Sequence, residues 1–290
     1  MSMRSLLVTN PGSRSGGSGL DEIESKLERW GELVRVDSKR PDDLPRAIRD
    51  NAEKVDQVIL GGGDGTVNLA LDALLDTGLP LGLLPMGTAN DLARSLSIPE
   101  DLEDALDIVL RGHLRHIDVG FANDVSFVNA IGMGLGPQMT REMDSETKSR
   151  FGVLAYLVGI LRAFRRQRCF SARIQGDGRS HEGRYLQITV ANGIHYGGGM
   201  TVADDAKIDD GLFDVLLVGK QSRLSLLANA FRFRSGQTRT ADTMTHRRYR
   251  EISIVTEPAL EVTADGEFLA ETPVECSLKS RALAIYVPES

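Results

Sequence analysis

Apolar and polar residues alternate in blocks along the first part of the chain, and the blocks have the periods of strands and helices in turn. Apolar runs at residues 5–9 and 55–60 have the length of buried strands, whereas Leu20–Trp30 repeats its large apolar residues at helical spacing. Strands that alternate with helices predict a parallel sheet with helices on both faces. The same pattern predicts further strands at 33–36 and 80–84, and further helices at 43–52, 67–76 and 92–96.

Beyond about Asp118 the pattern changes to short runs of β-branched and aromatic residues. Such runs, separated by turns such as residues 176–178, predict an antiparallel sandwich. Helical stretches are expected near 148–166 and 222–234, and the apolar segment 151–164 within the first suits a buried helix, the floor of an apolar cleft or an interfacial membrane segment. The strands are expected at 125–129, 171–175, 185–192, 213–218, 252–256, 260–264 and 282–287.

Residues 61–66, which read Gly-Gly-Gly-Asp-Gly-Thr, follow one of these strands and precede a helix. Glycine lets a backbone approach a ligand closely, and a helix N-terminus offers unpaired N–H groups and a partial positive charge to phosphate. Asp64 would repel polyphosphate directly, so we expect it to meet phosphate through Mg²⁺. The loop has neither the Walker pattern nor the Gly-x-Gly-x-x-Gly spacing of a dinucleotide site, and a glycine-rich turn with a surface aspartate stays the alternative.

Three loops of the first part each follow a predicted strand: residues 10–13, 61–66 and 85–91. Ligands of parallel sheets bind at the carboxyl ends of the strands, so these loops are expected to converge on one crevice. Asn90 or Asp91 is also expected to cap the helix that begins beside them, a role compatible with ligand binding.

The composition places the chain among soluble globular proteins and narrows its partners. Of its 290 residues, 41% are hydrophobic and 26% charged, and the net charge of −7 argues against nucleic-acid binding. Cys169 and Cys276 form neither a disulfide framework nor a metal-ligand pattern. The chain has no apolar run of about 18 residues for a transmembrane helix, and its start turns polar too soon for a secretory signal, so we expect a cytoplasmic protein. Arginines crowd residues 162–168 and 232–250, where they would face anionic lipid or phosphate, or form solvated helix faces.

Several motifs spread over nearly the whole chain point to one family. They are Asn10-Pro11, Gly61 to Asn68, Leu84 to Asp91, Gly197 to Gly199, Ala206 to Leu212 and Asp265-Gly266-Glu267. With these motifs the chain resembles the diacylglycerol kinase catalytic family, and within it the YegS-type bacterial lipid kinases. The glycine loop is shared with NAD kinases and sphingosine kinases, so the later motifs make the resemblance specific.

The resemblance implies a fold of two domains around an interdomain cleft. The first, residues 1–120, would be a Rossmann-like α/β domain that binds nucleotide, completed by residues 281–290. The second, residues 121–280, would be an antiparallel β-sandwich that binds the lipid substrate. Relatives often have threonine at the end of the second strand, where Asp37 stands here, and this acid would either bind ribose hydroxyls or weaken ATP binding.

The resemblance also assigns roles to individual residues. Glu267 would be the base that accepts the proton of the lipid hydroxyl, and Asp64 and Asp91 would belong to a network of Mg²⁺ and phosphate at the catalytic centre. A second, structural Mg²⁺ would be held by the carbonyls of Lys207 and Leu212 and by the carboxylate of Asp210. The ATP contacts would come from Asn10, Asp37, Gly61, Gly62, Gly63, Asp64, Gly65, Thr66, Asn68, Gly87, Thr88 and Asn90.

The expected function is therefore an ATP- and Mg²⁺-dependent lipid kinase. It would transfer the γ-phosphoryl group to a hydroxyl of diacylglycerol, phosphatidylglycerol or a related glycerolipid, as a peripheral protein at the inner face of the membrane. Two alternatives stay open: sphingoid-base or NAD kinase-like activity on the same scaffold, and a nucleotide-binding regulator without catalysis. A homodimer is also open.

Overall fold

The computed structural model describes residues 3–9, 19–37, 40, 42–134, 169–203, 205–220, 244–264 and 267–289. Asn10, the apolar segment 151–164, the helices expected at 148–166 and 222–234, and most of the arginine clusters lie outside these residues. In the described part, no helix is long and apolar enough to cross a membrane.

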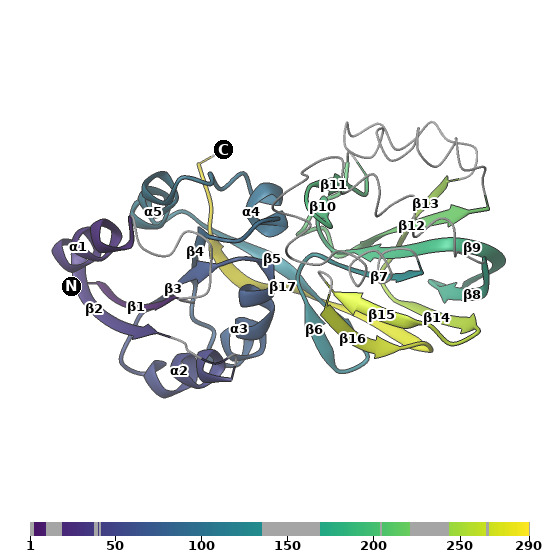
Figure 1. The fold of residues 1–290 in the computed structure, drawn as a ribbon, viewed down its shortest axis with the longest axis horizontal. Coiled ribbons are helices and arrows are strands. Elements are labelled where there is room, and N and C mark those ends of the chain that lie inside the picture. Colours follow the sequence, from purple (N-terminus) through teal and green to yellow (C-terminus); the bar gives the residue numbers. More distant parts are fainter. Residues whose placement is uncertain are drawn as a thin grey trace, which may run out of the picture.

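A parallel sheet with helices on both faces forms the first part of the structure. Its strands lie in the order β4 (Leu81–Pro85), β3 (Gln57–Gly62), β1 (Met3–Thr9) and β2 (Gly31–Asp37), all parallel. Helices α1 and α5 cover one face and α2 and α3 cover the other (Figure 1). The helices are α1 (Leu20–Trp30), α2 (Asp43–Asn51), α3 (Asp64–Thr77), α4 (Asp91–Ser95) and α5 (Leu102–Arg111).

Antiparallel strands make up the second part. A small separate hairpin is formed by β10 (His195–Tyr196) and β11 (Met200–Thr201). The larger strands are β5 (Leu114–Ala122), β6 (Val125–Phe127), β7 (Ala130–Gly134), β8 (Phe170–Gly176), β9 (Arg179–Ala191), β12 (Phe213–Gly219), β13 (Met244–Tyr249), β14 (Ile252–Glu257), β15 (Glu261–Ala264) and β16 (Glu267–Glu271).

The last strand, β17 (Val274–Tyr286), connects the two parts (Figure 1). It pairs with β14 and β5 in antiparallel fashion and then joins β4 in parallel through Ile285 and Leu81. The strands therefore form one continuous mixed sheet rather than two unconnected ones. Each part keeps its own apolar core, and Phe127 stacks on Phe213 in the second, with ring centroids 5.9 Å apart.

Helix α5 and strand β5 were not expected from the sequence. Asp101 caps α5, because its side chain accepts hydrogen bonds from the backbone N–H groups of Glu103 and Asp104. An aspartate directly before an apolar helical pattern is a recognised start signal, and it would have located this helix.

Candidate active site

The glycine turn after β3 is tighter than the expected loop over residues 61–66. Strand β3 continues through Gly62 and helix α3 begins at Asp64, so only Gly63 separates them. Gly61 and Gly62 stay in the strand because they pair with Leu84 and Pro85 of β4. The helix starts early because the N–H groups of Thr66 and Val67 donate to the carbonyl of Gly63, at 3.0 and 3.1 Å. Asp64 is therefore the first residue of a helix and not the centre of a loop.

Because glycine has no side chain, the glycine turn can contact the loop after β4. A Cβ atom on Gly87 would lie 2.6 Å from the Cα atom of Gly63, and one on Gly62 would lie 2.5 Å from the side chain of Thr66. Real Cβ atoms do not approach other atoms so closely, so any larger residue would push the two loops apart. The expected convergence of these two loops is confirmed, with the exposed Thr88 beside them.

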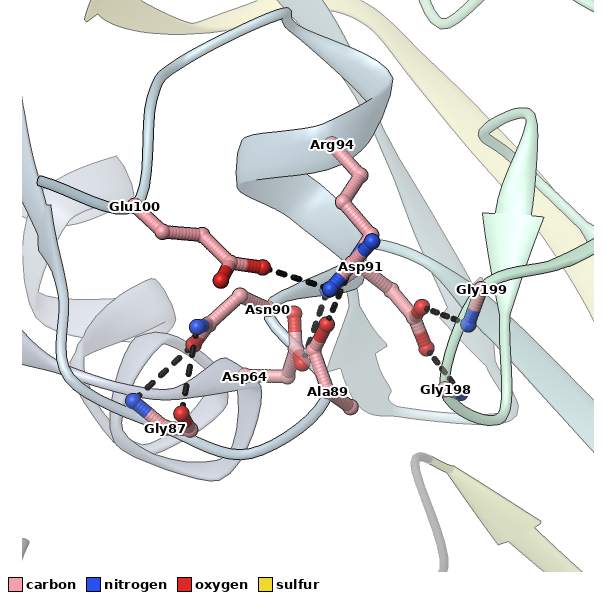
Figure 2. A network of polar contacts seen from close by, with 9 residues as sticks. All are labelled: Asp64, Gly87, Ala89, Asn90, Asp91, Arg94, Glu100, Gly198 and Gly199. Atoms are coloured by element: carbon pink, nitrogen blue, oxygen red, sulfur yellow. Dashed lines mark hydrogen bonds and ion pairs between the residues drawn. The ribbon is translucent and has the colours of Figure 1, made fainter. Parts of the chain in front are cut away.

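Asn90 shapes the loop after β4 without capping helix α4. Its backbone is left-handed, with φ of 50°, and its side chain accepts a hydrogen bond from the Gly87 N–H at 2.9 Å and donates one to the Gly87 carbonyl at 3.1 Å. Asn90 occupies the N-cap position of α4, as expected, but neither Asn90 nor Asp91 caps the helix with its side chain. Figure 2 shows that Asn90 turns back to Gly87 while Asp91 points to another part of the chain.

Asp64 supplies the missing cap from a distant part of the sequence. Its Oδ2 accepts the Asp91 N–H at 3.0 Å, and its Oδ1 accepts the Leu92 N–H at 3.0 Å and the Asn129 side-chain amide at 2.9 Å. The residue is 8% exposed. A carboxylate offers about four lone pairs, so these three hydrogen bonds leave one on Oδ2 for another ligand. Asn129 was missed because its sequence position, at the end of an apolar run, gives no signal of this role.

Asp91 connects helix α4 to the hairpin of β10 and β11. It is 1% exposed, and its two carboxylate oxygens accept the N–H groups of Gly198 and Gly199, at 2.9 and 2.7 Å (Figure 2). Burial raises the pKa of Asp91 above its ordinary value, and the like charge of Asp64 adds to the rise. The glycines have φ of 91° each, which strongly favours glycine there.

Ser95 and His195 strengthen the same connection. The His195 N–H donates to Ser95 Oγ at 3.2 Å, and the His195 ring nitrogen Nδ1 lies 3.4 Å from that oxygen. Burial and the charge of Arg94 lower the pKa of His195. Helix α4 is thus joined to the second part of the molecule by side chains that sequence reasoning did not bring together.

Glu267 lies across from the glycine turn. It is the exposed first residue of β16, and its Oε1 would lie 3.5 Å from a Cβ atom on Gly65. Gly65 belongs to the first turn of α3, and Asn68 lies one turn further along the same helix. A carboxylate from the second part of the chain therefore lies beside the helix N-terminus that follows the glycine turn.

Asp37, another expected nucleotide contact, is the last residue of β2 and is in register with Thr9 of β1.

The acidic segment before β12 was expected to hold a structural cation. The Asp210 carboxylate accepts the Leu212 N–H at 3.1 Å, and its pKa is raised by burial and by the charges of Asp214 and Asp118. Among the described residues, no group of three or more histidine, cysteine or acidic side chains could hold a metal. A cation here would therefore depend on backbone carbonyls, as the resemblance implies for Lys207 and Leu212.

Both parts of the chain match known domain families. Residues 4–122 match the diacylglycerol kinase catalytic domain, and residues 129–287 match the YegS C-terminal NAD kinase beta sandwich-like domain. The expected fold class, an α/β domain followed by a β-sandwich domain, is thereby confirmed.

Relatives and solved structures agree with these matches. A diacylglycerol kinase of Staphylococcus aureus (strain bovine RF122 / ET3-1) is 29% identical over 99% of this chain and 93% of its own length. An uncharacterized protein of Synechocystis sp. is 30% identical over 92% of this chain, which spans 64% of that relative. A solved diacylglycerol kinase structure from Bacillus anthracis str. Sterne has a TM-score of 0.76 at 25% identity and covers 98% of this chain and 97% of its own. Another structure from that strain has a TM-score of 0.82 at 28% identity, covering 98% and 95%.

The fold and the matched domains place the protein in the lipid kinase class of enzymes. The chain belongs to the diacylglycerol kinase catalytic family, in the group whose second domain is the YegS C-terminal β-sandwich.

Proposed function

We propose that this protein is an ATP- and Mg²⁺-dependent kinase that phosphorylates a hydroxyl of diacylglycerol, phosphatidylglycerol or a related glycerolipid. The observation that carries the proposal is the approach of Glu267 to Gly65, at 3.5 Å from its Cβ position. It brings an acidic side chain beside a helix N-terminus suited to phosphate. Phosphoryl transfer needs this combination of in-line positioning, charge neutralisation and a group that accepts the hydroxyl proton.

The first domain is proposed to hold the nucleotide. The first backbone N–H groups of a helix have no acceptor within the helix, and Gly63 and Gly65 at the start of α3 are partly exposed. Mg²⁺ would neutralise phosphate charge, and the remaining lone pair on Asp64 Oδ2 fits one bond to it or to its water. The proposed nucleotide contacts are Asn10, Gly61, Gly62, Gly63, Gly65, Thr66, Asn68, Gly87, Thr88 and Asn90.

Glu267 is proposed to accept the proton of the attacking hydroxyl. Leu69, one helical turn beyond Gly65 on the same side of α3, is a large apolar residue that is 40% exposed. An acceptor with its hydroxyl at Glu267, beside Gly65, would have this apolar side chain nearby. This environment favours a lipid over a soluble dinucleotide such as NAD, and it supports an assignment of residues 121–280 to the acceptor.

Two further parts of the proposal concern metal and membrane. A second Mg²⁺ is assigned to the Asp210 carboxylate and the carbonyls of Lys207 and Leu212. Asp118 and Asp214 add negative charge there, which Arg248, paired with Asp214 at 2.9 Å, partly offsets. A lipid acceptor implies that the protein works as a peripheral protein at the inner, cytoplasmic surface of a membrane.

The decisive experiment measures ATP consumption with a panel of lipids in mixed micelles, with NAD and sphingosine as competing acceptors. Consumption that depends on a glycerolipid, and that is lost in Glu267→Gln, is the expected result. Phosphorylation of NAD or sphingosine alone would favour the alternative kinases. Nucleotide binding without any transfer would favour a regulator.

A further inference from the structure

Strand β9 passes from one sheet layer of the second domain to the other. Its residues 179–184 pair with β8, and its later residues pair with β7 and β12, with a register shift between Val218 and Gly219 of β12. Strands of a sandwich change sheets through such irregularities. In the part of the chain that the structure describes, residues 179–184 have a partner strand on one side only, and so has β13, which pairs with β12. The second domain therefore has two strand edges here.

The first of these edges places charged side chains on the inner face of its sheet. His181 is in register with Ile174 of β8, which is buried in the core of the second domain. Residues directly opposite each other on paired strands project to the same face, and so do alternate residues of one strand. His181 and Arg179 of β9 therefore both project toward the side of the core.

The second edge does the same from β13. Arg247 is in register with Val215 and Tyr249 with Phe213, and both partners are buried in that same core. Tyr249 also contacts the hairpin of β8 and β9, because a Cβ atom on Gly176 would lie 2.6 Å from Cδ1 of its ring. Gly176 is in register with the first residue of β9. The inner faces of the two edges therefore meet at Tyr249.

Three polar atoms on these inner faces are buried without a hydrogen-bond partner among the described residues. They are the Tyr249 hydroxyl, Arg247 Nε and His181 Nε2. Tyr249 is only 2% exposed. Buried polar groups in folded proteins are nearly always hydrogen-bonded, and an unpaired one costs stability. Three of them on two facing strand edges indicate that a ligand completes their hydrogen bonds.

The charges at this place select an anion. Burial raises the pKa of the Tyr249 hydroxyl, and the charges of Arg247 and Arg179 oppose that rise, so both guanidinium groups lie near a hydroxyl that keeps its proton. Neither arginine forms an ion pair in the described part of the chain. Asp177 is also near, but its carboxylate oxygens accept the backbone N–H of Arg250, at 3.2 and 3.4 Å. Donors and positive charge therefore await an acceptor with negative charge.

We propose that Arg179, His181, Arg247 and Tyr249 form a phosphate-binding site on the second domain, separate from the candidate active site. Guanidinium groups offer N–H donors in a geometry that matches phosphate oxygens, and the tyrosine hydroxyl adds a further donor. Inorganic phosphate has this chemistry. The phosphomonoester headgroup that a lipid kinase creates on its product has the same chemistry.

Thermal unfolding with and without inorganic phosphate tests the site, with sodium chloride of equal ionic strength as the reference. The variants are Arg247→Gln and Tyr249→Phe. The matched control is Arg184→Gln, which removes an exposed arginine from the outer face of the same strand, in register with exposed Ser171. Circular dichroism checks that each variant folds, and ATP titration checks that the Kd for nucleotide is unchanged.

The wild-type protein and Arg184→Gln should gain Tm with phosphate, whereas Arg247→Gln and Tyr249→Phe should bind phosphate about tenfold more weakly or worse. In phosphate-free buffer Tyr249→Phe should be at least as stable as the wild type, because it removes a donor that has no partner. A lower Tm of Tyr249→Phe in that buffer would show that the hydroxyl is already satisfied, and would overturn the inference.

Flotation with vesicles distinguishes the two sources of phosphate. Phosphatidylcholine vesicles carry either phosphatidic acid, a phosphomonoester, or phosphatidylglycerol, a phosphodiester, at equal surface charge. If lipid supplies the phosphate, Arg247→Gln loses a preference for phosphatidic acid that Arg184→Gln keeps; if free phosphate is the ligand, only the phosphate response in solution is lost. Arg247→Gln that matches Arg184→Gln in both assays would overturn the inference and leave the proposed function untouched.

Discussion

Replacement of Asp64 by asparagine separates the structural role of this residue, as a hydrogen-bond acceptor that stabilises α4, from its proposed role in binding Mg²⁺. The Asp64 carboxylate holds the first N–H groups of α4, from Asp91 and Leu92, and the amide of Asn129. Asparagine keeps one carbonyl oxygen and gains an NH₂ group. If its oxygen takes the place of Oδ1, the bonds from Leu92 and Asn129 survive, but the NH₂ group then faces the Asp91 N–H, a donor opposite a donor.

The expected loss of stability follows from this mismatch. A buried donor without an acceptor costs about 1–3 kcal/mol. Loss of the negative charge at the start of α4 adds about 0.3–1 kcal/mol. We therefore expect Asp64→Asn to lower the free energy of unfolding by about 1–4 kcal/mol, and the Tm by about 2–7 °C. This loss should appear without nucleotide or metal.

Thermal and urea unfolding, each with and without Mg²⁺ and ATP, measure both roles. The matched control is Asp76→Asn on the same helix, because Asp76 makes only an exposed ion pair with Arg49, worth about 0–1 kcal/mol. If ligand-free Asp64→Asn is as stable as Asp76→Asn, the hydrogen bonds of Asp64 do not stabilise the protein as proposed, and the structural role is refuted. If Asp64→Asn keeps the full stabilisation by Mg²⁺ and ATP, the proposed metal role fails instead.

Three further predictions concern the base, the buried acid and the second cation site. Glu267→Gln should lower kcat by about 10²–10⁴-fold with an unchanged Kd for ATP, and a near-normal rate in the micelle assay would remove Glu267 as the base. Because the pKa of Asp91 is raised in the folded protein, its contribution to stability should fall as pH rises from about 4 through that raised pKa. Urea unfolding between pH 4 and 7 should therefore show a wild-type minus Asp91→Asn difference that decreases with pH, and a flat difference would contradict the sign. Asp210→Ala should lose the rise in Tm on Mg²⁺ addition, whereas Asp209→Asn, which removes a pair with Arg115, should keep it; equal responses would refute the assignment.

The spacing of apolar residues along the sequence made much of the fold predictable. The helix Leu20–Trp30 has the bounds that its apolar spacing predicts, and the strands of the parallel sheet lie within a few residues of their expected positions. Strand β5 was missed, and its partner β17 is far along the chain. Strand β3 extends into the glycines because β4 pairs with them, a contact that apolar periodicity does not report.

The candidate site was predictable as a set of residues but not as a set of contacts. Each residue type indicated a chemistry: glycine for close approach, acids for metal or proton transfer. The partners of Asp64, however, lie 27, 28 and 65 residues away, and those of Asp91 lie 107 and 108 residues away. No local spacing encodes such pairs. The same separation in sequence explains why the capping side chain of α4 was not predicted: Asn90 has the N-cap position, but the carboxylate that accepts the first N–H groups is that of Asp64 on α3.

The contacts of Asp64 and Asp91 also explain how two acidic side chains can lie beside the proposed phosphate site. Four backbone N–H groups and one side-chain amide donate to these two carboxylates and partly compensate their negative charge. The same bonds form a chain from α3 through α4 to the hairpin of the second domain. Glu267 approaches α3 at its Gly65 side. Contacts through α4 and contacts at α3 therefore both fix the distance between the proposed nucleotide loop and Glu267. A substitution at Asp91 should change the rate of phosphoryl transfer more than the affinity for nucleotide.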